Sequence, residues 1–262
     1  MARHAWAGAA TLPSMFESDA VLLALDTATD RVHLALVDAA GCHAQVLPGG
    51  AQASTTLLPA AEALLADRGL TWAQVRGVAC GLGPGAFTGL RTACSVAQGL
   101  ALGLGCPTLG LNTLMAVAED ARLRQPEAVP PGQRVWVLQD ARMSELYVAA
   151  FDWDGVAWTE AVAPALWPLD EPARRWAVEP GGSLVLAGSG VAVLPPETRD
   201  ALMPAVRHHD AEACPSGAAL GRLAQVAWTR GERLDAALML PRYVRDKVAQ
   251  TTAERLQARQ SV

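Results

Sequence analysis

An internal repeat is the feature that most constrains the fold of this chain. Residues 21–41, VLLALDTATDRVHLALVDAAG, align without a gap to residues 135–155, VWVLQDARMSELYVAAFDWDG, which lie 114 positions later. The alignment places Asp140 on Asp26. Each copy is typical of a buried strand that ends on an aspartate, a turn, and a returning strand that ends in a tight turn. Such self-similarity indicates two copies of one structural unit.

Similar elements are predicted after each copy. After the first we expect a strand near Gln45, a helix close to Leu57, a strand that ends at Cys80, a helix from about Thr88 and a short strand at Thr108. After the second we expect a strand over 158–162, a weakly patterned stretch over 164–180, a strand over 184–187 and a helix over about 216–230. This order predicts a duplicated α/β protein with two lobes.

The amino-acid composition indicates the size of the core, the redox compartment and the kind of contact with nucleic acid that we expect. Its 262 residues are 51% apolar, which is enough for a sizeable core. The five cysteines are odd in number and form no C-x-x-C pair, so a reducing, cytoplasmic setting fits best. The net charge is −5 and Lys247 is the one lysine, without any basic run. Contact with nucleic acid is therefore expected to be shared with a partner.

The stretch from Gly77 to Ala118 carries a single charged side chain, Arg91. It is long enough to span a bilayer, but glycines and Pro107 break it halfway, which argues against a membrane span. Residues 81–86, GLGPGA, satisfy a loose dinucleotide pattern without the acidic residue that should follow about 20 positions later. A P-loop also fails because its lysine is missing.

A ridge of small residues gives this stretch a third interpretation. On a helix from about Thr88, small residues recur at every fourth position: Gly89, Ala93, Ala97, Ala101 and Gly105. Another backbone can approach such a ridge closely. The ridge packs either against the chain's own sheet, which is the commoner case, or against another subunit.

A second apolar segment precedes that ridge. Apolar residues lie at helical spacing from Leu57 to Leu65, Pro59 suits a first helical turn, and Gly69 suits the end of the helix. The two helices together predict either a layer of the core or half of an intermolecular bundle.

Several ordered motifs give the chain a family resemblance. The motifs are residues 25–29 (LDTAT), 81–91 (GLGPGAFTGLR), 97–101 (AQGLA), 112–114 (NTL), 140–147 (DARMSELY) and 241–245 (PRYVR). Over about residues 20–250 the chain resembles the TsaB (YeaZ) family of the ASKHA superfamily, which contains actin, sugar kinases and heat-shock ATPases. The resemblance implies a duplicated two-lobed α/β fold of the actin-like ATPase, ribonuclease H-like type.

The family resemblance also implies a function and partners. TsaB proteins are non-catalytic subunits that dimerise with the paralogous transferase TsaD for N6-threonylcarbamoylation of adenosine 37 in tRNAs that read ANN codons. The small ATPase TsaE joins the complex, and tRNA is reached through the complex. The isolated chain is expected as a monomer or a homodimer. The alternative, from another class, is a stand-alone ATPase or small-molecule phosphotransferase of the same superfamily.

The implied pairing surface lies on the two helices that follow the first hairpin. Its predicted residues are Leu57, Leu58, Ala61, Leu65, Arg91, Cys94, Ala97, Gln98 and Leu102. Because a cation in the first turn of a helix opposes the helix dipole, Arg91 either serves a carboxylate elsewhere or is simply exposed. The predicted lobes are residues 21–117 and 118–250, between an N-terminal extension over 1–20, expected to be poorly ordered, and a tail over 251–262.

The nucleotide site of the superfamily is expected to survive only as a vestige. Its positions here are Asp26, Thr27, Thr29 and Asp140. The second turn has long side chains where nucleotide-binding relatives use glycine, so we interpret both aspartates as caps of turns. No catalytic residue is predicted, and no cofactor beyond weak, vestigial ATP binding. No metal site is predicted either, since no two histidines lie four apart, and His33 is interpreted as a solvated or hydrogen-bonded side chain.

Overall fold

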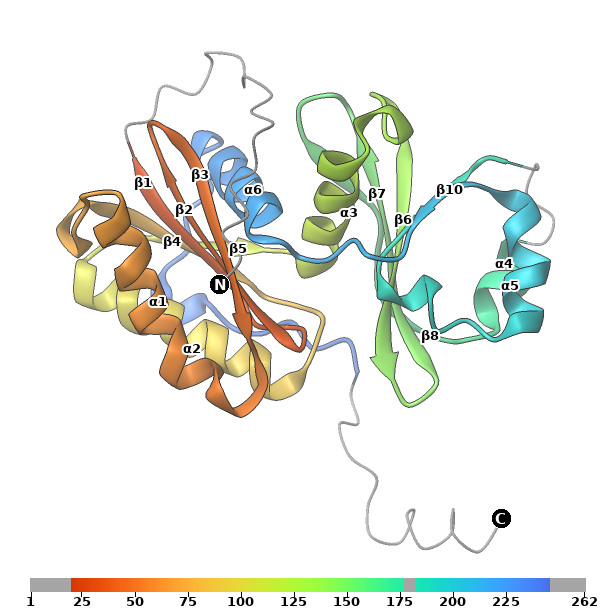
Figure 1. Ribbon diagram of the computed structural model, residues 1–262, viewed down its shortest axis with the longest axis horizontal. Helices are drawn as coiled ribbons and strands as arrows, with labels where there is room; N and C mark the ends of the chain where they lie inside the picture. Colours follow the sequence, from red (N-terminus) through yellow and green to blue (C-terminus); the bar gives the residue numbers. More distant parts are fainter. Residues whose placement is uncertain (1–19, 177–181, 246–262) are drawn as a thin grey trace, which may run out of the picture.

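Two five-stranded mixed sheets form the frame of the molecule in the computed structural model, which describes residues 20–176 and 182–245 (Figure 1). The strands are β1 (Val21–Asp26), β2 (Arg31–Asp38), β3 (Gly41–Pro48), β4 (Val75–Gly81), β5 (Thr108–Leu111), β6 (Arg134–Arg142), β7 (Glu145–Trp153), β8 (Trp158–Pro168), β9 (Leu184–Ala187) and β10 (Val206–Asp210). The α-helices are α1 (Ala53–Asp67), α2 (Phe87–Leu104), α3 (Thr113–Arg124), α4 (Glu171–Trp176), α5 (Pro196–Leu202) and α6 (Gly217–Thr229).

The two sheets have the same topology. The first has the order β3-β2-β1-β4-β5, and the second, read from its other edge, has the order β8-β7-β6-β9-β10. In both sheets the first three strands along the chain pair antiparallel and the last two join in parallel. The duplicated two-lobed α/β fold predicted from the repeat is therefore confirmed.

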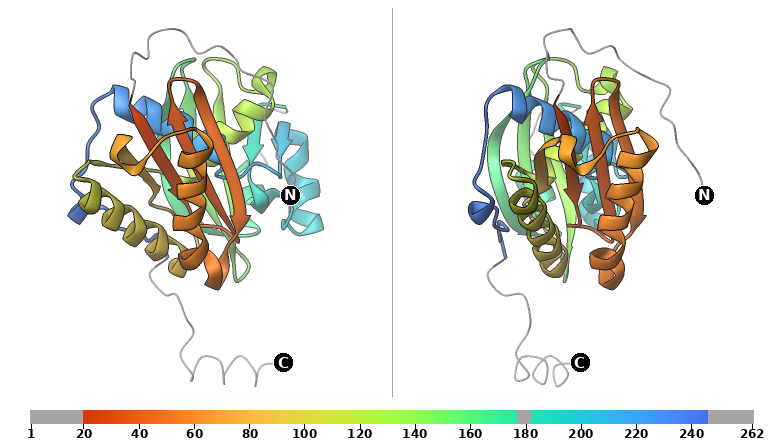
Figure 2. Two further views of the ribbon diagram at one scale, coloured as in Figure 1. Left: turned by 60° about the vertical axis from the view of Figure 1, so that its left-hand side comes forward. Right: turned by 90° about the vertical axis from the view of Figure 1, so that its left-hand side faces the viewer.

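Helices and sheets alternate in five layers. Helices α1 and α2 lie side by side over one face of the first sheet, as Figure 2 shows. The last helix of each half packs across the molecule, α3 against the second sheet and α6 against the first, and the two helices touch each other between the sheets. Helices α4 and α5 cover the outer face of the second sheet.

Because α3 packs on the second sheet and α6 on the first, the lobes differ from the predicted residue ranges. The predicted boundary at residues 117 and 118 falls inside α3, and α6, predicted in the second lobe, contacts strands of the first sheet. The reason is close packing, since a Cβ on Gly217 of α6 would lie 2.5 Å from the carbonyl oxygen of Leu34. The predicted tail and all but the last residue of the predicted extension lie outside the described residues.

Helix α1 differs from its prediction at one end. It begins at Ala53, six residues before Pro59, instead of at the proline. A proline inside a helix removes one hydrogen bond, here to the carbonyl of Thr55, and both residues lie on the exposed side where water replaces that bond. Gly69 follows the helix in a left-handed conformation, with φ of 66°, as predicted for its end.

Three apolar cores stabilise these layers. One lies between the first sheet and α1 with α2, one between the second sheet and α4 with α5, and the largest surrounds α3 and α6 and joins the two lobes. None of the helices in the described residues is long and apolar enough to cross a membrane.

Candidate functional site

The turn after β1 encloses Asp26 completely. One carboxylate oxygen, Oδ1, accepts a hydrogen bond from the backbone N–H of Ala28 at 2.6 Å, and Oδ2 accepts one from the Thr113 hydroxyl at 2.7 Å. A Cβ on Gly81 of the neighbouring strand would lie only 1.8 Å from Oδ2, so only glycine fits there. Burial raises the pKa of Asp26 from 3.8 to about 6. The carboxylate is thus closed off by the chain's own groups.

Both threonines of this turn are also engaged. The Thr27 hydroxyl, which is buried, donates a hydrogen bond to the carbonyl of Gly89 in the first turn of α2 at 2.6 Å. The Thr29 hydroxyl donates to the carbonyl of Arg31 at 3.3 Å. The Thr27 bond fixes the turn against α2, whereas the Thr29 bond stays within the hairpin.

The corresponding turn of the second lobe is closed in another way. Asp140 Oδ1 accepts a hydrogen bond from the backbone N–H of Arg142 at 2.7 Å, and Oδ2 pairs with the guanidinium of Arg142 at 2.8 Å. The three residues of the hairpin tip, Arg142, Met143 and Ser144, all have left-handed backbones with φ between 57° and 62°. The prediction that both aspartates cap turns is confirmed by these bonds.

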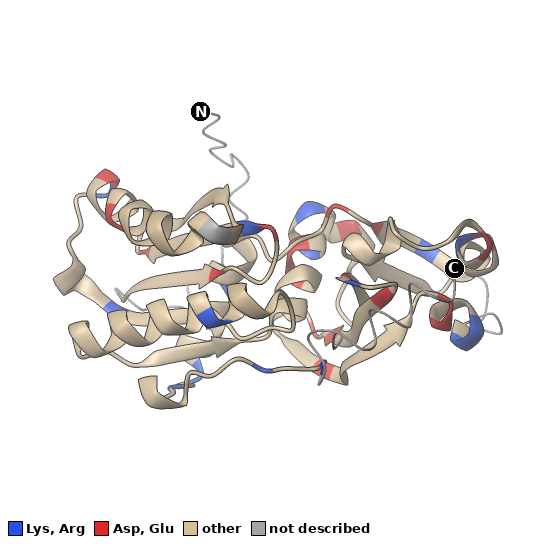
Figure 3. Cartoon of the chain, turned by 90° about the horizontal axis from the view of Figure 1, so that it is seen from below, with Lys and Arg blue, Asp and Glu red and all other residues tan. Residues whose placement is uncertain are grey.

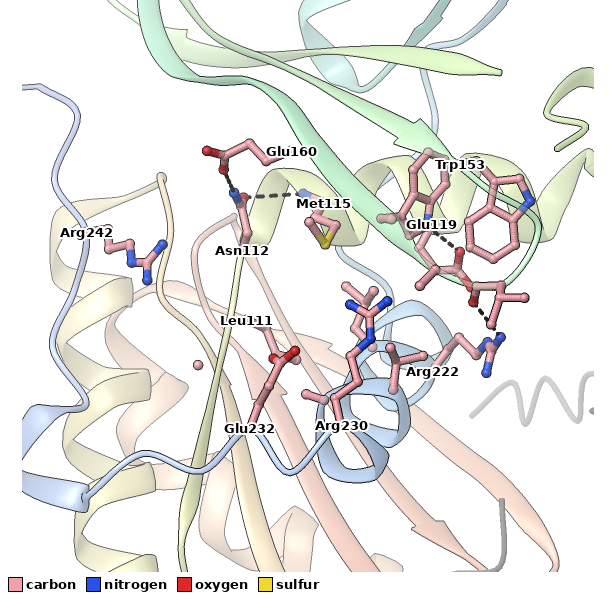
Figure 4. A pocket seen from close by; sticks show the side chains of 17 residues that line it. Leu111, Asn112, Met115, Glu119, Trp153, Glu160, Arg222, Arg230, Glu232 and Arg242 are labelled. Atoms are coloured by element: carbon pink, nitrogen blue, oxygen red, sulfur yellow. Dashed lines mark hydrogen bonds between the residues drawn. The ribbon is translucent and has the colours of Figure 1, made fainter. Parts of the chain in front are cut away.

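A cavity of about 200 Å³ lies between the lobes, away from both aspartates. Its walls come from the end of β5, the start of α3, the hairpin between β7 and β8, and α6 (Figure 4). At one end, the Asn112 amide donates to a carboxylate oxygen of Glu160 at 3.2 Å and so bridges the lobes. Sequence patterns did not predict this cavity, because its lining comes from residues 110–119, 153–160 and 222–232 and from Arg242, which lie far apart in the chain. No group of three or more metal-ligating side chains gathers within the described residues.

Most of the predicted pairing residues point into the chain. Five of them are buried in the core beneath α1 and α2: Leu57, Ala61, Leu65, Cys94 and Ala97. Their side chains therefore fill the chain's own core and not an exposed surface, which corrects their predicted placement. Of the remaining four, Leu58 is 42% exposed, Leu102 is 73% exposed, Arg91 is exposed and Gln98 is half-buried.

A different ridge of small residues forms the exposed face of α2. Ser95, Gly99 and Gly103 recur at every fourth position there and are all exposed. A Cβ on Gly99 or Gly103 would meet no atom within 4 Å. By contrast, a Cβ on Gly89, which belongs to the predicted ridge, would lie 1.9 Å from the carbonyl oxygen of Thr27. The inward ridge packs on the chain itself, whereas the outward ridge has no neighbour among the described residues.

Charge is sparse around this exposed ridge. Helix α2 carries only Arg91, and α1 carries only Glu62 and Asp67. Figure 3 shows the first lobe mostly without charged segments, whereas the second lobe has many. Arg91 does not serve a carboxylate among the described residues, since its Nε donates to the hydroxyl of Tyr243 at 3.0 Å and its guanidinium lies 3.7 Å from the ring centre of Phe87.

His33 differs from its prediction. It lies in β2, almost fully buried, and neither ring nitrogen has a hydrogen-bond partner in the described structure. Burial lowers the pKa of His33 from 6.5 to about 4. The sequence could not reveal this, because burial of this face of β2 depends on the distant helix α6.

The chain is similar to known proteins over most of its length. The family model described as TsaD, tRNA N6-adenosine threonylcarbamoyltransferase, matches residues 46–253. The tRNA threonylcarbamoyladenosine biosynthesis protein TsaB of Escherichia coli is 35% identical over 51% of this chain and 55% of that protein. The TsaB protein of Haemophilus influenzae is 40% identical over 48% of this chain and 51% of that protein. The matched part thus spans about half the length of these curated relatives.

A solved structure covers more of the chain. YeaZ from Pseudomonas aeruginosa has 32% sequence identity and a TM-score of 0.72, with 86% of this chain and 99% of that one covered. Two five-stranded sheets of the same topology, with helices α3 and α6 between them, define the ASKHA-type class of two-lobed α/β proteins. Within that class, the chain belongs to the TsaB/YeaZ family.

Proposed function

We propose that this chain is a non-catalytic subunit that pairs with a TsaD-type transferase in the synthesis of N6-threonylcarbamoyladenosine in tRNA, in the cytoplasm, with a TsaE-type ATPase joining the complex. The names of the relatives and of the family model support the pathway. The exposed face of α2 supports the pairing.

The glycines of α2 carry the pairing proposal. Glycine inside a helix is about 0.5–1 kcal/mol less favourable than alanine, so an exposed helical glycine needs a reason. The chain itself provides none at Gly99 or Gly103, because a side chain at either position would stand in open space. Close approach of a second helix along the i, i+4 ridge supplies that reason.

The surroundings of the ridge suit a protein partner. Leu102 stands beside the glycines with most of its side chain in water. Centres of protein interfaces are depleted of charged residues, as α1 and α2 are, with three charges in two helices. Leu58 on α1 extends the apolar surface. A second copy of this chain offers the same surface, so a homodimer is the competing occupant when the transferase is absent.

The closed turns support a non-catalytic role. Bound Mg²⁺ takes oxygen ligands, yet both oxygens of Asp26 and of Asp140 already accept hydrogen bonds from the chain. A nucleotide-bound metal ion would have to reach a fully buried carboxylate in one lobe, or compete with the Arg142 guanidinium for the carboxylate in the other.

Two matched substitutions, each of which adds one carboxylate to an exposed helix position, test the pairing. Leu102→Glu places a carboxylate at the centre of the proposed interface, where its desolvation costs several kcal/mol, and Ala201→Glu places one on the exposed side of α5 in the other lobe. We expect both variants to keep the circular dichroism spectrum of the wild type. In sedimentation velocity with the TsaD paralogue, only Ala201→Glu should still form the complex. Complex formation by Leu102→Glu at wild-type affinity would refute this face as the interface.

A further inference from the structure

The last described segment of the chain crosses from one lobe to the other. We call residues 240–245 the strap. On the first lobe, the backbone N–H of Arg242 donates to the carbonyl of Leu82 at 2.8 Å. On the second lobe, the guanidinium of Arg245 pairs with Glu145 and donates to the carbonyl of Arg142 at 3.3 Å. The strap therefore holds the hairpin tip between β6 and β7 next to the start of α2.

Aromatic rings and a guanidinium are stacked where the strap meets α2. The rings of Tyr243 and Phe87 lie 4.9 Å apart, and the guanidinium of Arg91 lies 3.7 Å from the centre of the Phe87 ring. The bond from Arg91 Nε to the Tyr243 hydroxyl holds the guanidinium in place. Tyr243 is 46% exposed, so the stack is open to solvent. The two rings are inclined to each other by 31°, and the guanidinium covers one of them.

Two of the arginines here have no carboxylate to neutralise them within residues 20–176 and 182–245. Arg91 bonds only to Tyr243, and the exposed side chain of Arg242 has no ion pair there. The carboxylates that face this region are Asp140 and Glu145, which pair with Arg142 and Arg245, and Glu160 and Glu232, which line the inter-lobe cavity together with Arg242. Arg91 and Arg242 are therefore the two guanidinium groups of this region that form no ion pair with a described carboxylate.

The hairpin tip extends the same surface to the second lobe. Arg142 has a side chain that is 78% exposed, and Met143 is 56% exposed. Each left-handed residue other than glycine is disfavoured by about 1–2 kcal/mol, yet three occur in succession at this tip. Such strain is often retained at functional positions. We define the strap patch by the half-buried Phe87 and five exposed residues: Arg91, Arg142, Met143, Arg242 and Tyr243.

We propose that the strap patch binds RNA directly, through phosphates at Arg91 and Arg242 and through an unstacked base against the rings and Met143. The inference rests on the proposed function, which makes tRNA the RNA concerned. Arginine planes and aromatic faces are the groups on which proteins stack bases of unpaired RNA, and arginine forks suit phosphate. A protein partner fits the apolar, charge-poor face of α2 better than this patch.

The small size of the patch sets the expected affinity. Two arginines without ion pairs can make two phosphate contacts. These contacts would add to the tRNA affinity of the transferase and could not replace it. Loss of one phosphate contact lowers the slope of log K against log salt by about 0.7–0.9, which corresponds to about sixfold in affinity at 0.1 M monovalent salt. Loss of both phosphate contacts would therefore weaken the affinity for RNA about fortyfold at this salt concentration.

Fluorescence anisotropy with labelled tRNA that reads an ANN codon tests this proposal. The full chain is measured in complex with the TsaD paralogue, as wild type and as Arg242→Gln, Arg91→Gln and Arg76→Gln, over a range of salt concentrations. Arg76 is the matched control, because it is exposed, has no ion pair in the described structure and lies at the opposite end of β4 from the strap. Circular dichroism and sedimentation with the TsaD paralogue check folding and pairing of each variant.

We expect Arg242→Gln and Arg91→Gln each to weaken tRNA binding about sixfold with a shallower salt slope, whereas Arg76→Gln binds as the wild type. Equal losses in all three variants, or no loss at the strap, would overturn the proposal. Loss of pairing with the transferase in the strap variants would show that the patch is a protein interface, which also overturns it. Failure of the proposed function is a separate result, because the wild-type chain would then not pair with the transferase at all.

Discussion

Replacing Gly99 by alanine should make the free chain more stable and the complex weaker. In the free chain, the new methyl group stands in open space, since nothing lies within 4 Å of that Cβ position. Replacing glycine by alanine in a helix interior raises the free energy of unfolding by about 0.5–1 kcal/mol. In the complex, the same methyl group would stand between two helices whose close approach depends on its absence.

The two effects have opposite signs and are measured separately. Urea unfolding of the free chain should show a gain of about 0.5–1 kcal/mol, which corresponds to roughly 1–4 °C in Tm for a chain of this size. Overpacking of a close contact costs about 1–3 kcal/mol, so the dissociation constant for the TsaD paralogue should rise about fivefold or more. Isothermal titration calorimetry measures that constant.

A matched control separates close packing from general effects of substitution. Gly89→Ala lies on the same helix, but its methyl group would clash with the Thr27 carbonyl inside the chain. We expect that variant to lose stability in the free form. If Gly99→Ala gains stability and binds the transferase as tightly as the wild type, the outward ridge is not the contact and the reasoning fails.

Three further predictions concern stability. His33→Leu should raise the free energy of unfolding at pH 7 by about 1–3 kcal/mol in urea, because it removes a buried ring without hydrogen-bond partners; an unchanged or lower value would mean that the ring has a partner such as water. Because burial raises the pKa of Asp26 from 3.8 to about 6, this carboxyl stabilises the fold fully below pH 3.8 and loses that contribution as the pH rises through 6. Asp26→Asn should therefore cost on the order of 1 kcal/mol at pH 7 and up to about 3 kcal/mol more near pH 4, and parallel pH profiles of wild type and variant would contradict this. Ser144→Gly should raise the free energy of unfolding by roughly 0.5–1 kcal/mol because φ is 59° there, whereas Ser54→Gly in α1 should lower it. If urea unfolding shows that both variants change the free energy in the same direction, the hairpin tip is not strained.

The repeat made the fold predictable to a large extent. Two aligned hairpins fixed two equivalent sheets, and the strand over 184–187 has its predicted bounds. Helix α6 spans Gly217–Thr229, close to the predicted range of about 216–230, and the Ser216 hydroxyl caps it by accepting from the N–H of Ala219. These features depend on local patterns of apolar and capping residues, which the sequence displays directly.

The exchange of α3 and α6 could not be read from such patterns. It depends on contacts between distant segments, such as the approach of Gly217 to Leu34. The orientation of α2 had the same difficulty. Its two ridges of small residues are alike in sequence, and only the contact of Gly89 with Thr27 decides which of them faces inward. The sequence analysis predicted pairing along the ridge of Gly89, Ala93 and Ala97, which faces the core. Several of the predicted pairing residues therefore belong to the core.

The strap and the inter-lobe cavity were beyond sequence analysis for a related reason. Arg91 and Tyr243 are 152 positions apart, and no local pattern relates them. The motif over residues 241–245 was visible in the sequence, but its role as a bridge between the lobes depends on the position of the hairpin tip after β6.

The central claim is that the chain acts by pairing with a transferase and performs no chemistry itself. The most direct test is reconstitution of tRNA modification from purified TsaD and TsaE proteins, tRNA and Mg-ATP, with threonylcarbamoyl-AMP supplied by the enzyme TsaC from threonine and bicarbonate, and with the modified nucleoside measured by mass spectrometry. The account predicts N6-threonylcarbamoyladenosine with the wild-type chain or Ala201→Glu, and little or none with Leu102→Glu or without the chain. Formation of the nucleoside at the wild-type rate without the chain, or with Leu102→Glu, would contradict the account.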